Sequence, residues 1–253
     1  MIFLASFRKE IMEQVRTSRL LILTVVLVAF GLMSPLFAKY TPELLRMLPG
    51  GEDFASMVPE PTLLDSVAQY VKNVNQFGIL LALLFTMGVV AQEKERGTAA
   101  MMLVKPISRG AFLLAKFVAL GLAFLISIVL AGIGAYYYTM ILFSAPDFGA
   151  WMALTALIWL QVLVYIALTL LFSTLVRSQA AAAGLGLGAI LIFSLLGSLP
   201  SLGRYLPGEL VSWGMGFFTP ARLSAAWPAF WVSLGIILVS LAAAWLVFER
   251  QEL

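Results

Sequence analysis

The sequence predicts an all-α protein that crosses a membrane six times, and three observations support this. Of the 253 residues, 62% are hydrophobic and 11% are charged, whereas soluble domains carry about 25% charged residues. The mean hydropathy is +1.00. Six stretches lack charge and reach the roughly 20 residues that a membrane-spanning helix needs. Each must be helical because lipid offers the backbone no hydrogen-bond partner. We therefore expect a single polytopic membrane domain.

Short polar turns and longer loops set the limits of the predicted spans. These spans cover residues 20–38, 73–92, 112–146, 148–176, 178–200 and 225–248. Asp147, beside Pro146, marks a tight turn after the third span, and Arg177 marks another after the fourth. The external loops are then 39–72 and 201–224. The end of the first loop, 63–72, can extend the second span as helix. Within the second loop, residues 210–221 predict a re-entrant or interfacial helix, with an ordinary apolar loop as the alternative.

The basic residues indicate how the chain is oriented. With the N-terminus inside, eleven Lys and Arg residues fall on the inner side and five on the outer side. Cytoplasmic loops of membrane proteins carry the excess of Lys and Arg. We therefore expect both termini in the cytoplasm.

Residues 1–19 predict an amphipathic interfacial helix ahead of the first span. Its apolar positions recur at helical spacing and are Phe3, Leu4, Phe7, Ile11 and Val15. Its charged positions include Arg8, Lys9, Glu10 and Glu13. Such a helix lies in the plane of the membrane surface. It is either a simple anchor or a docking element for a cytoplasmic partner.

The cytoplasmic loop 93–111 carries the most specific pattern in the chain. Glu93, Glu95 and Arg96 follow the second span, Gly97 permits a bend, and Thr98 can cap a short helix. Pro106 ends that helix, Ser108 can cap the third span, and Arg109 begins it. The pattern predicts a short surface helix connected to two spans.

This loop resembles that of the ABC type-2 transporter permeases. The matching positions are Glu93, Glu95, Gly97, Thr98, Met102, Leu103, Pro106, Ser108, Arg109 and Lys116, while Ala115 replaces the family's glycine. The resemblance implies a bacterial or archaeal inner-membrane protein that works with two cytoplasmic ABC ATPase subunits and a second permease copy, as a homodimer or heterodimer. It also implies that the 1–19 helix and the 93–109 loop couple to the ATPase, and that ATP and Mg are bound there and not by this chain.

Several other classes of function are excluded or disfavoured. The chain has no cysteine and no histidine, which removes thiolate and imidazole chemistry. The stretch 110–116 has Ala115 in place of the second glycine of a phosphate-binding loop, and Phe117 in place of its Ser or Thr. The serines within the spans lack a base, so an intramembrane protease is disfavoured. Charged groups are nearly absent from the middle of the spans, which disfavours ion-coupled transport. The spread of the basic residues does not indicate nucleic-acid binding.

Four residues are candidates for the dimer seam or the translocation path. Gly184 and Gly188 are four residues apart in the fifth span, a spacing that allows close helix approach. Asn75 and Gln161 are polar residues within spans. All four could instead serve packing or hydrogen bonding within one subunit.

We expect a permease subunit of an ATP-driven exporter for an amphipathic or lipid-like cargo, such as a peptide, drug or lipid, in contact with membrane lipid. A pore for small ions or sugars would place more polar residues in the middle of the spans. The alternatives are a non-transporting membrane scaffold or immunity protein, and an ion-independent secondary transporter.

Overall fold

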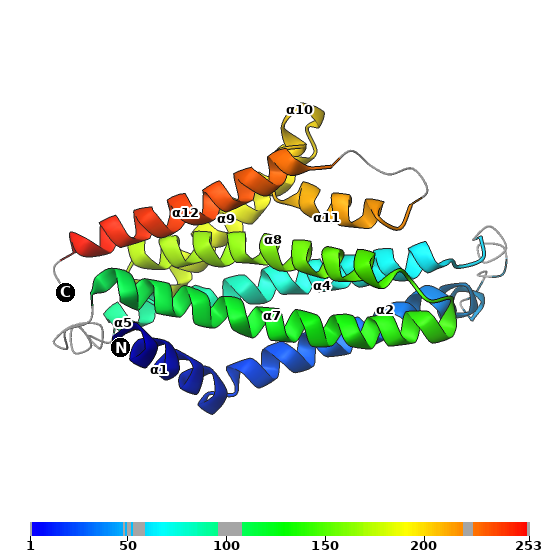
Figure 1. Cartoon of the computed structure of the whole chain (residues 1–253), viewed down its shortest axis with the longest axis horizontal. Helices are drawn as coiled ribbons and strands as arrows, with labels where there is room; N and C mark the ends of the chain where they lie inside the picture. The colour runs from blue at the N-terminus through cyan, green and yellow to red at the C-terminus, as the bar shows by residue number, and fades with distance from the viewer. Residues whose placement is uncertain are drawn as a thin grey trace.

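Ten helices and no strand make up the part of the chain that the computed structural model describes, residues 2–47, 49, 52, 59–95, 108–219 and 225–251. The helices are α1 (Ile2–Arg16), α2 (Arg19–Arg46), α4 (Leu63–Thr86), α5 (Ala91–Glu95), α7 (Arg109–Leu142), α8 (Phe148–Leu175), α9 (Gln179–Gly197), α10 (Pro200–Gly203), α11 (Gly208–Gly216) and α12 (Trp227–Glu249). Figure 1 shows the long helices side by side, with both termini and α5 at one end. We call this the termini end, and the opposite one the far end.

The six predicted spans are confirmed as helices that are long and apolar enough to cross a membrane. They are α2, Leu63–Glu95 (α4 with α5), α7, α8, α9 and α12. The shortest, α9, has 19 residues. At 1.5 Å per residue it spans about 28 Å, close to the hydrocarbon thickness of a bilayer.

Several helices differ in length from the predicted spans. Residues 39–46, predicted as external loop, continue α2, and 63–72 continue α4 as the sequence allowed. A capping box fixes the start of α4, since Asp65 Oδ2 accepts from Thr62 N at 2.8 Å and from Thr62 Oγ1 at 2.7 Å. The third predicted span extends to residue 146, whereas α7 ends earlier, at Leu142. A charged residue limits the part of a helix that can lie in lipid. It does not end the helix, which extends into water where capping residues stabilise its end.

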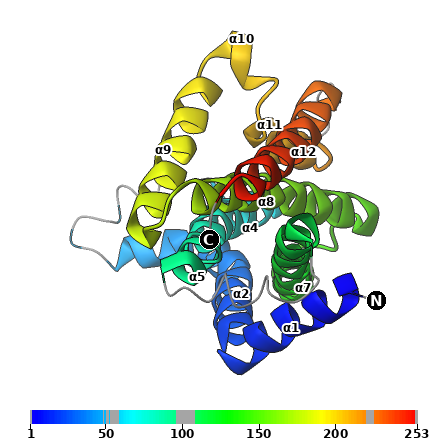
Figure 2. The same cartoon turned by 90° about the vertical axis from the view of Figure 1, so that its left-hand side faces the viewer.

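The centre of the bundle is α8. In its most apolar stretch 72% of the residues are buried, against 11% in α9 and 22% in α12. Figure 2 looks along the bundle and shows α9 and α12 on one side of α8, with α1 and α2 on the other. Large apolar side chains remain exposed along the outer spans, including Leu191, Leu195 and Leu238, as expected of surfaces that face lipid.

Close backbone contact joins α2 to α7. A Cβ at Gly31 would lie 2.6 Å from the Ala131 carbonyl oxygen, which is closer than such atoms approach. Only glycine therefore permits this crossing.

At the far end, α11 lies in the segment where the sequence predicts a re-entrant or interfacial helix. It has nine residues, too few to cross a bilayer. It contacts α4, α8, α9 and α12, and Leu210 and Val211 are buried in these contacts.

Candidate functional site

At the termini end, α1 packs a stripe of polar residues against the bundle. Ser18, with φ 57°, makes the sharp turn between α1 and α2. Ser6, Glu10 and Gln14, spaced four residues apart, are buried. The apolar residues Leu4 and Val15 are exposed instead. The amphipathic helix thus turns its apolar side outward, as a helix at a lipid surface does, and its polar stripe toward α7.

Five charged side chains from three helices meet at this stripe, and we call them the charge cluster. They are Lys9, Glu10 and Glu13 of α1, Glu93 of α5 and Lys116 of α7. Lys116 Nζ lies 3.1 Å and 3.2 Å from the two carboxylate oxygens of Glu10, and 2.8 Å from Glu93 Oε1. One ammonium group therefore connects α1, α5 and α7.

Lys116 is the most buried member of the charge cluster. Its side chain is 2% exposed, and that of Glu10 is 9% exposed. A buried charge is tolerated only where opposite charges and hydrogen bonds replace water. Two carboxylates do so here, and the ammonium also lies 4.8 Å from the centre of the Phe112 ring.

Lys9 adds a second, more exposed cation. Its Nζ lies 3.1 Å from Glu10, 3.5 Å from Glu13 and 3.7 Å from Glu93. Partial burial lowers the pKa of Lys9, but the attraction of Glu10, Glu93 and Glu13 outweighs it, so the pKa lies above the ordinary 10.5. The side chain is therefore charged at neutral pH and holds the carboxylates together.

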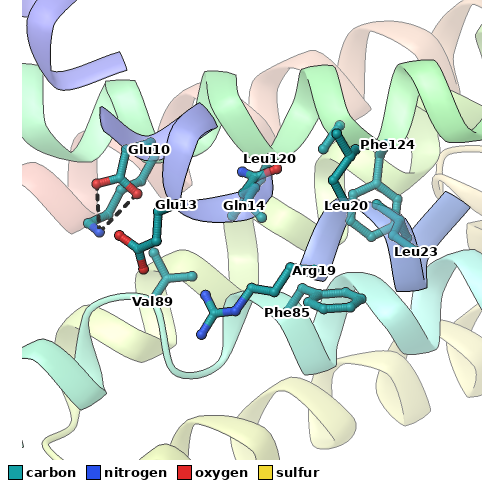
Figure 3. Close-up of a pocket in the computed structure, with 12 residues that line it drawn as sticks. Glu10, Glu13, Gln14, Arg19, Leu20, Leu23, Phe85, Val89, Leu120 and Phe124 are labelled. Atoms are coloured by element: carbon teal, nitrogen blue, oxygen red, sulfur yellow. Dashed lines mark hydrogen bonds and ion pairs between the residues drawn. The ribbon is translucent and has the colours of Figure 1, made fainter. Parts of the chain in front are cut away.

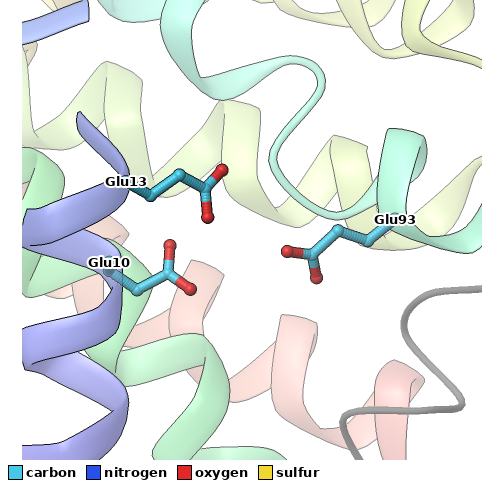
Figure 4. Close-up of side chains that lie close together, drawn as sticks. All are labelled: Glu10, Glu13 and Glu93. Carbon is cyan, nitrogen blue, oxygen red and sulfur yellow. The ribbon is translucent and has the colours of Figure 1, made fainter. Parts of the chain in front are cut away.

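The three carboxylates of the charge cluster form an ion-pair network and not an open cation site. Figure 4 shows the three side chains pointing toward one another. An oxygen of each lies within 4.8 Å of the others, and hard metal ions prefer such oxygens. Each carboxylate already has a lysine ammonium within 3.5 Å, Glu13 through Lys9 and the other two through Lys116.

A small pocket between α1, α2, α4 and α7 adjoins the charge cluster. Figure 3 shows Glu10, Glu13 and Gln14 toward one end and Leu20, Leu23 and Phe124 at the other, with Arg19 beside Phe85 between them. Apolar side chains beside the charge cluster lower the local polarity, which strengthens its ion pairs.

A second polar network lies on the other side of α5. Lys94 Nζ donates to the Thr174 carbonyl at 2.6 Å and to Gln251 Oε1 at 3.3 Å, while Gln251 Nε2 donates to the same carbonyl at 2.9 Å. Ser173 Oγ accepts from the backbone N–H groups of residues 90 and 91 and donates to the carbonyl of residue 87. These bonds fix the turn between α4 and α5.

Arg109 caps the C-terminal end of α12. Its guanidinium donates to the carbonyls of Phe248, Glu249 at 3.0 Å and Gln251 at 2.8 Å. The last carbonyls of a helix lack partners within the helix and attract positive charge. Through Arg109 the start of α7 is joined to the end of α12.

The structure brings together four of the sequence-predicted coupling residues, Lys9, Glu10, Glu13 and Glu93. Arg8 and Glu95 are exposed, Ser108 caps α7 by accepting from Ala111 N at 3.3 Å, and Arg109 binds α12. Arg96, Gly97, Thr98 and Pro106 lie outside the described residues, so their predicted roles stay predictions.

Sequence reasoning missed the partners that connect these residues. The motif includes Lys116, but nothing in its spacing pairs this lysine with α1. The available signal for a buried partner is its isolation among the apolar residues at 110–146. Ser173 and Gln251 carried no signal, because a serine within a span and a glutamine near the end of the chain are common.

The predicted path and seam residues fall in two different places. Asn75 and Gln161 line one cavity of about 350 Å³ between α4, α8, α9 and α11. Gly184 and Gly188 lie on α9, where a Cβ would meet nothing within 4 Å. These glycines therefore do not pack against the described part of their own chain.

Two comparisons with known proteins agree with this architecture. Residues 4–209 match the family model described as ABC-2 family transporter protein. The chain is also 29% identical over 216 residues to YxlG of Bacillus subtilis (strain 168), described as an uncharacterized transmembrane protein, and the match covers 83% of this chain and 82% of that one.

Proposed function

The chain belongs to the ABC-2 transporter family, a family of transporter membrane subunits, and from this premise we propose that it is the permease subunit of an ATP-driven exporter. In this proposal two copies of a separate cytoplasmic ATPase bind ATP and Mg, and two permease copies form the path. The cargo is amphipathic or lipid-like. Both termini then lie in the cytoplasm of a bacterial or archaeal cell, and the protein sits in the inner membrane.

The charge cluster is the observation that carries the coupling part of the proposal. Within it, Lys116 of α7 pairs with one acid on α1 and one on α5. These two helices belong to the two segments that the resemblance assigns to contact with the ATPase. A force applied at either segment therefore reaches one rigid group of helices. Packed elements of this kind move as bodies and transmit small displacements over long distances.

The second network extends this group to the rest of the bundle. Lys94 and Ser173 connect α5 to the end of α8, and Arg109 connects α7 to α12. A movement of α5 is thus passed to helices on both sides of α8. In our proposal this is how closure of the ATPase changes the path.

The exposure of α9 supports the dimeric part of the proposal. It is the least buried span, and its glycines at 184 and 188 face no described part of this chain. Small residues allow a second helix to approach closely in lipid. We place the seam between the two permeases along this helix.

Co-purification tests the proposal. The permease, expressed with an ABC ATPase subunit from the same genome, is expected to bring its cognate ATPase down in stoichiometric amount and to stimulate ATP hydrolysis in lipid. The variant Glu93→Gln keeps the shape of the side chain but weakens the ion pair with Lys116. We expect it to insert normally and to lose most of the stimulation.

The matched control is Glu249→Gln, an exposed acid at the same end whose side chain is outside both networks. It should behave as wild type. Full stimulation by Glu93→Gln would contradict the role of the charge cluster. A permease that binds no ATPase would favour the scaffold alternative.

A further inference from the structure

A side chain of α8 enters the second span between α4 and α5. In an uninterrupted helix the N–H of Ala91 would donate to the carbonyl of Met87, four residues earlier. Here the Ser173 hydroxyl lies between the two groups, since it accepts from Ala91 N at 2.9 Å and donates to the Met87 carbonyl at 2.9 Å. Figure 4 shows the chain as a plain loop just before the short helix that carries Glu93. The hydroxyl therefore takes the place of one hydrogen bond of the helix.

All hydrogen bonds that a hydroxyl group can make are used by Ser173 in this segment. Val90 N also donates to Ser173 Oγ, at 3.1 Å. The hydroxyl thus accepts two hydrogen bonds and donates one, which is its full capacity. Ser173, Val90 and Ala91 are each 0% exposed. Water is excluded from the two N–H groups and cannot substitute for the hydroxyl.

The residues of the interruption do not by themselves account for it. Sharp breaks in helices occur at proline, at glycine or serine pairs, at π-bulges, or where a side chain enters the hydrogen-bond ladder. Residues 87–90 read Met-Gly-Val-Val and include no proline. The backbone of Gly88, the one glycine, is not in the left-handed region that favours this residue. The inserted hydroxyl is the cause that remains.

We propose that Ser173 is a positioning residue for α5, whose hydroxyl interrupts the second span and so sets the direction of this short helix. With that direction, Glu93 lies 2.8 Å from the Lys116 ammonium. Lys94 holds α5 to the same end of α8, through the Thr174 carbonyl at 2.6 Å. The proposal deepens the proposed function, and rests on it only for the statement that the direction of α5 affects the ATPase.

Removal of the hydroxyl should restore a continuous helix. In Ser173→Ala the N–H groups of Val90 and Ala91 lose their acceptor where water is excluded, which is unfavourable for buried backbone groups. Closure of the helix gives each of them the carbonyl four residues earlier as a new acceptor. Glu95 is eight residues beyond Met87, or about 12 Å along a helix, so straightening a bend of about 20° displaces it by about 4 Å.

Distances between pairs of spin labels in the permease alone test this displacement. The chain has no cysteine, so introduced cysteines carry the only labels. One label is at Glu95→Cys, which is exposed at the end of α5. The second is at one of three exposed positions on α2, α7 and α12, namely Leu21→Cys, Leu114→Cys or Leu246→Cys.

The measurement uses lipid nanodiscs, with labelled chain diluted in unlabelled chain so that distances between copies do not contribute. In Ser173→Ala we expect at least one of the three mean distances to change by about 2 Å or more, because a displacement of about 4 Å cannot be perpendicular to all three directions. Ser173→Thr retains the hydroxyl and should keep the distances of the wild type.

The matched control is Thr174→Val, which removes another buried hydroxyl from the same end of α8. That hydroxyl donates to the Leu171 carbonyl of its own helix at 2.6 Å, and the backbone carbonyl of residue 174 stays in place for Lys94. All three distances should be those of the wild type. With the ATPase present, Ser173→Ala should lose most of the stimulation of ATP hydrolysis, and Ser173→Thr and Thr174→Val should retain it.

Three unchanged distances in Ser173→Ala would overturn the proposal, because the interruption would then persist without the hydroxyl. Shifts of equal size in Thr174→Val would also overturn it, since loss of either buried hydroxyl would then move α5. These distances are measured without ATPase, so they stand or fall separately from the proposed function. Full stimulation by a Ser173→Ala protein with shifted distances would overturn the link between the direction of α5 and the ATPase.

Discussion

Substitution of Lys116 by methionine is the sharpest test of the charge cluster. Methionine fills a similar volume but leaves Glu10 and Glu93 without the ammonium that lies 3.1 Å and 2.8 Å from them. Removal of one partner of a buried ion pair costs about 3–5 kcal/mol. Glu10 keeps Lys9 at 3.1 Å, so we expect the lower end, about 3 kcal/mol.

The free energy of unfolding can be measured by reversible denaturation with SDS in mixed micelles, with helicity as the signal. Hydrogen exchange should show the loss locally, as faster exchange across Ile2–Arg16. The double variant Lys116→Met with Glu10→Gln removes both charges of one pair. We expect it to cost about 1–2 kcal/mol less than the sum of the single variants, because neighbouring charges are coupled.

The result that would refute this reasoning is a loss of less than about 0.5 kcal/mol in Lys116→Met, the range of ordinary surface substitutions. Additive single variants would also contradict it, since they would mean that Lys116 and Glu10 do not interact. Either outcome would show that water reaches the charge cluster.

Three further predictions follow from the packing and the charges. Arg109→Gln removes the cation at the end of α12 and should destabilise the protein by about 1–2 kcal/mol, with faster hydrogen exchange over 245–251. Gly31→Ala places a methyl group against the Ala131 carbonyl and should cost about 1–3 kcal/mol in SDS denaturation, whereas Gly235→Ala, where nothing lies within 4 Å, should cost nothing. Because the pKa of Lys9 is raised above 10.5, its contribution to stability is fully present below pH 10.5 and is lost as pH rises through the folded-state pKa. The melting temperature of wild type should therefore fall toward that of Lys9→Met above pH 10.5, and a constant gap would contradict this sign.

The six spans could be predicted because their determinants are local. A stretch of about 20 uncharged residues in lipid has one solution, the helix. The sequence also allowed helix over 63–72, which α4 confirms, but it predicted external loop over 39–46, where α2 continues. The point where a helix ends in water depends on capping residues, such as Thr62 with Asp65 at the start of α4, and the distribution of charge does not indicate it.

The candidate site could be predicted only in part, for a related reason. The charged positions of α1 and the residues after the second span identified Lys9, Glu10, Glu13 and Glu93 as a functional group. Their convergence on Lys116 depends on how α1 crosses α7, which is a property of tertiary packing. The expectation that the apolar positions of α1 mark a lipid face agrees with the exposure of Leu4 and Val15, but the sequence did not indicate that the opposite stripe would be buried.

Cross-linking from α5 tests the central claim most directly. Glu95 is exposed at the end of α5, so Glu95→p-benzoylphenylalanine places a photoreactive group where we expect the ATPase to bind. In membranes that contain both subunits, illumination should yield a permease–ATPase adduct whose amount changes with ATP. The same group at Glu60, which precedes α4 at the far end, should give none. An adduct from Glu60 and none from Glu95 would contradict both the orientation and the coupling surface.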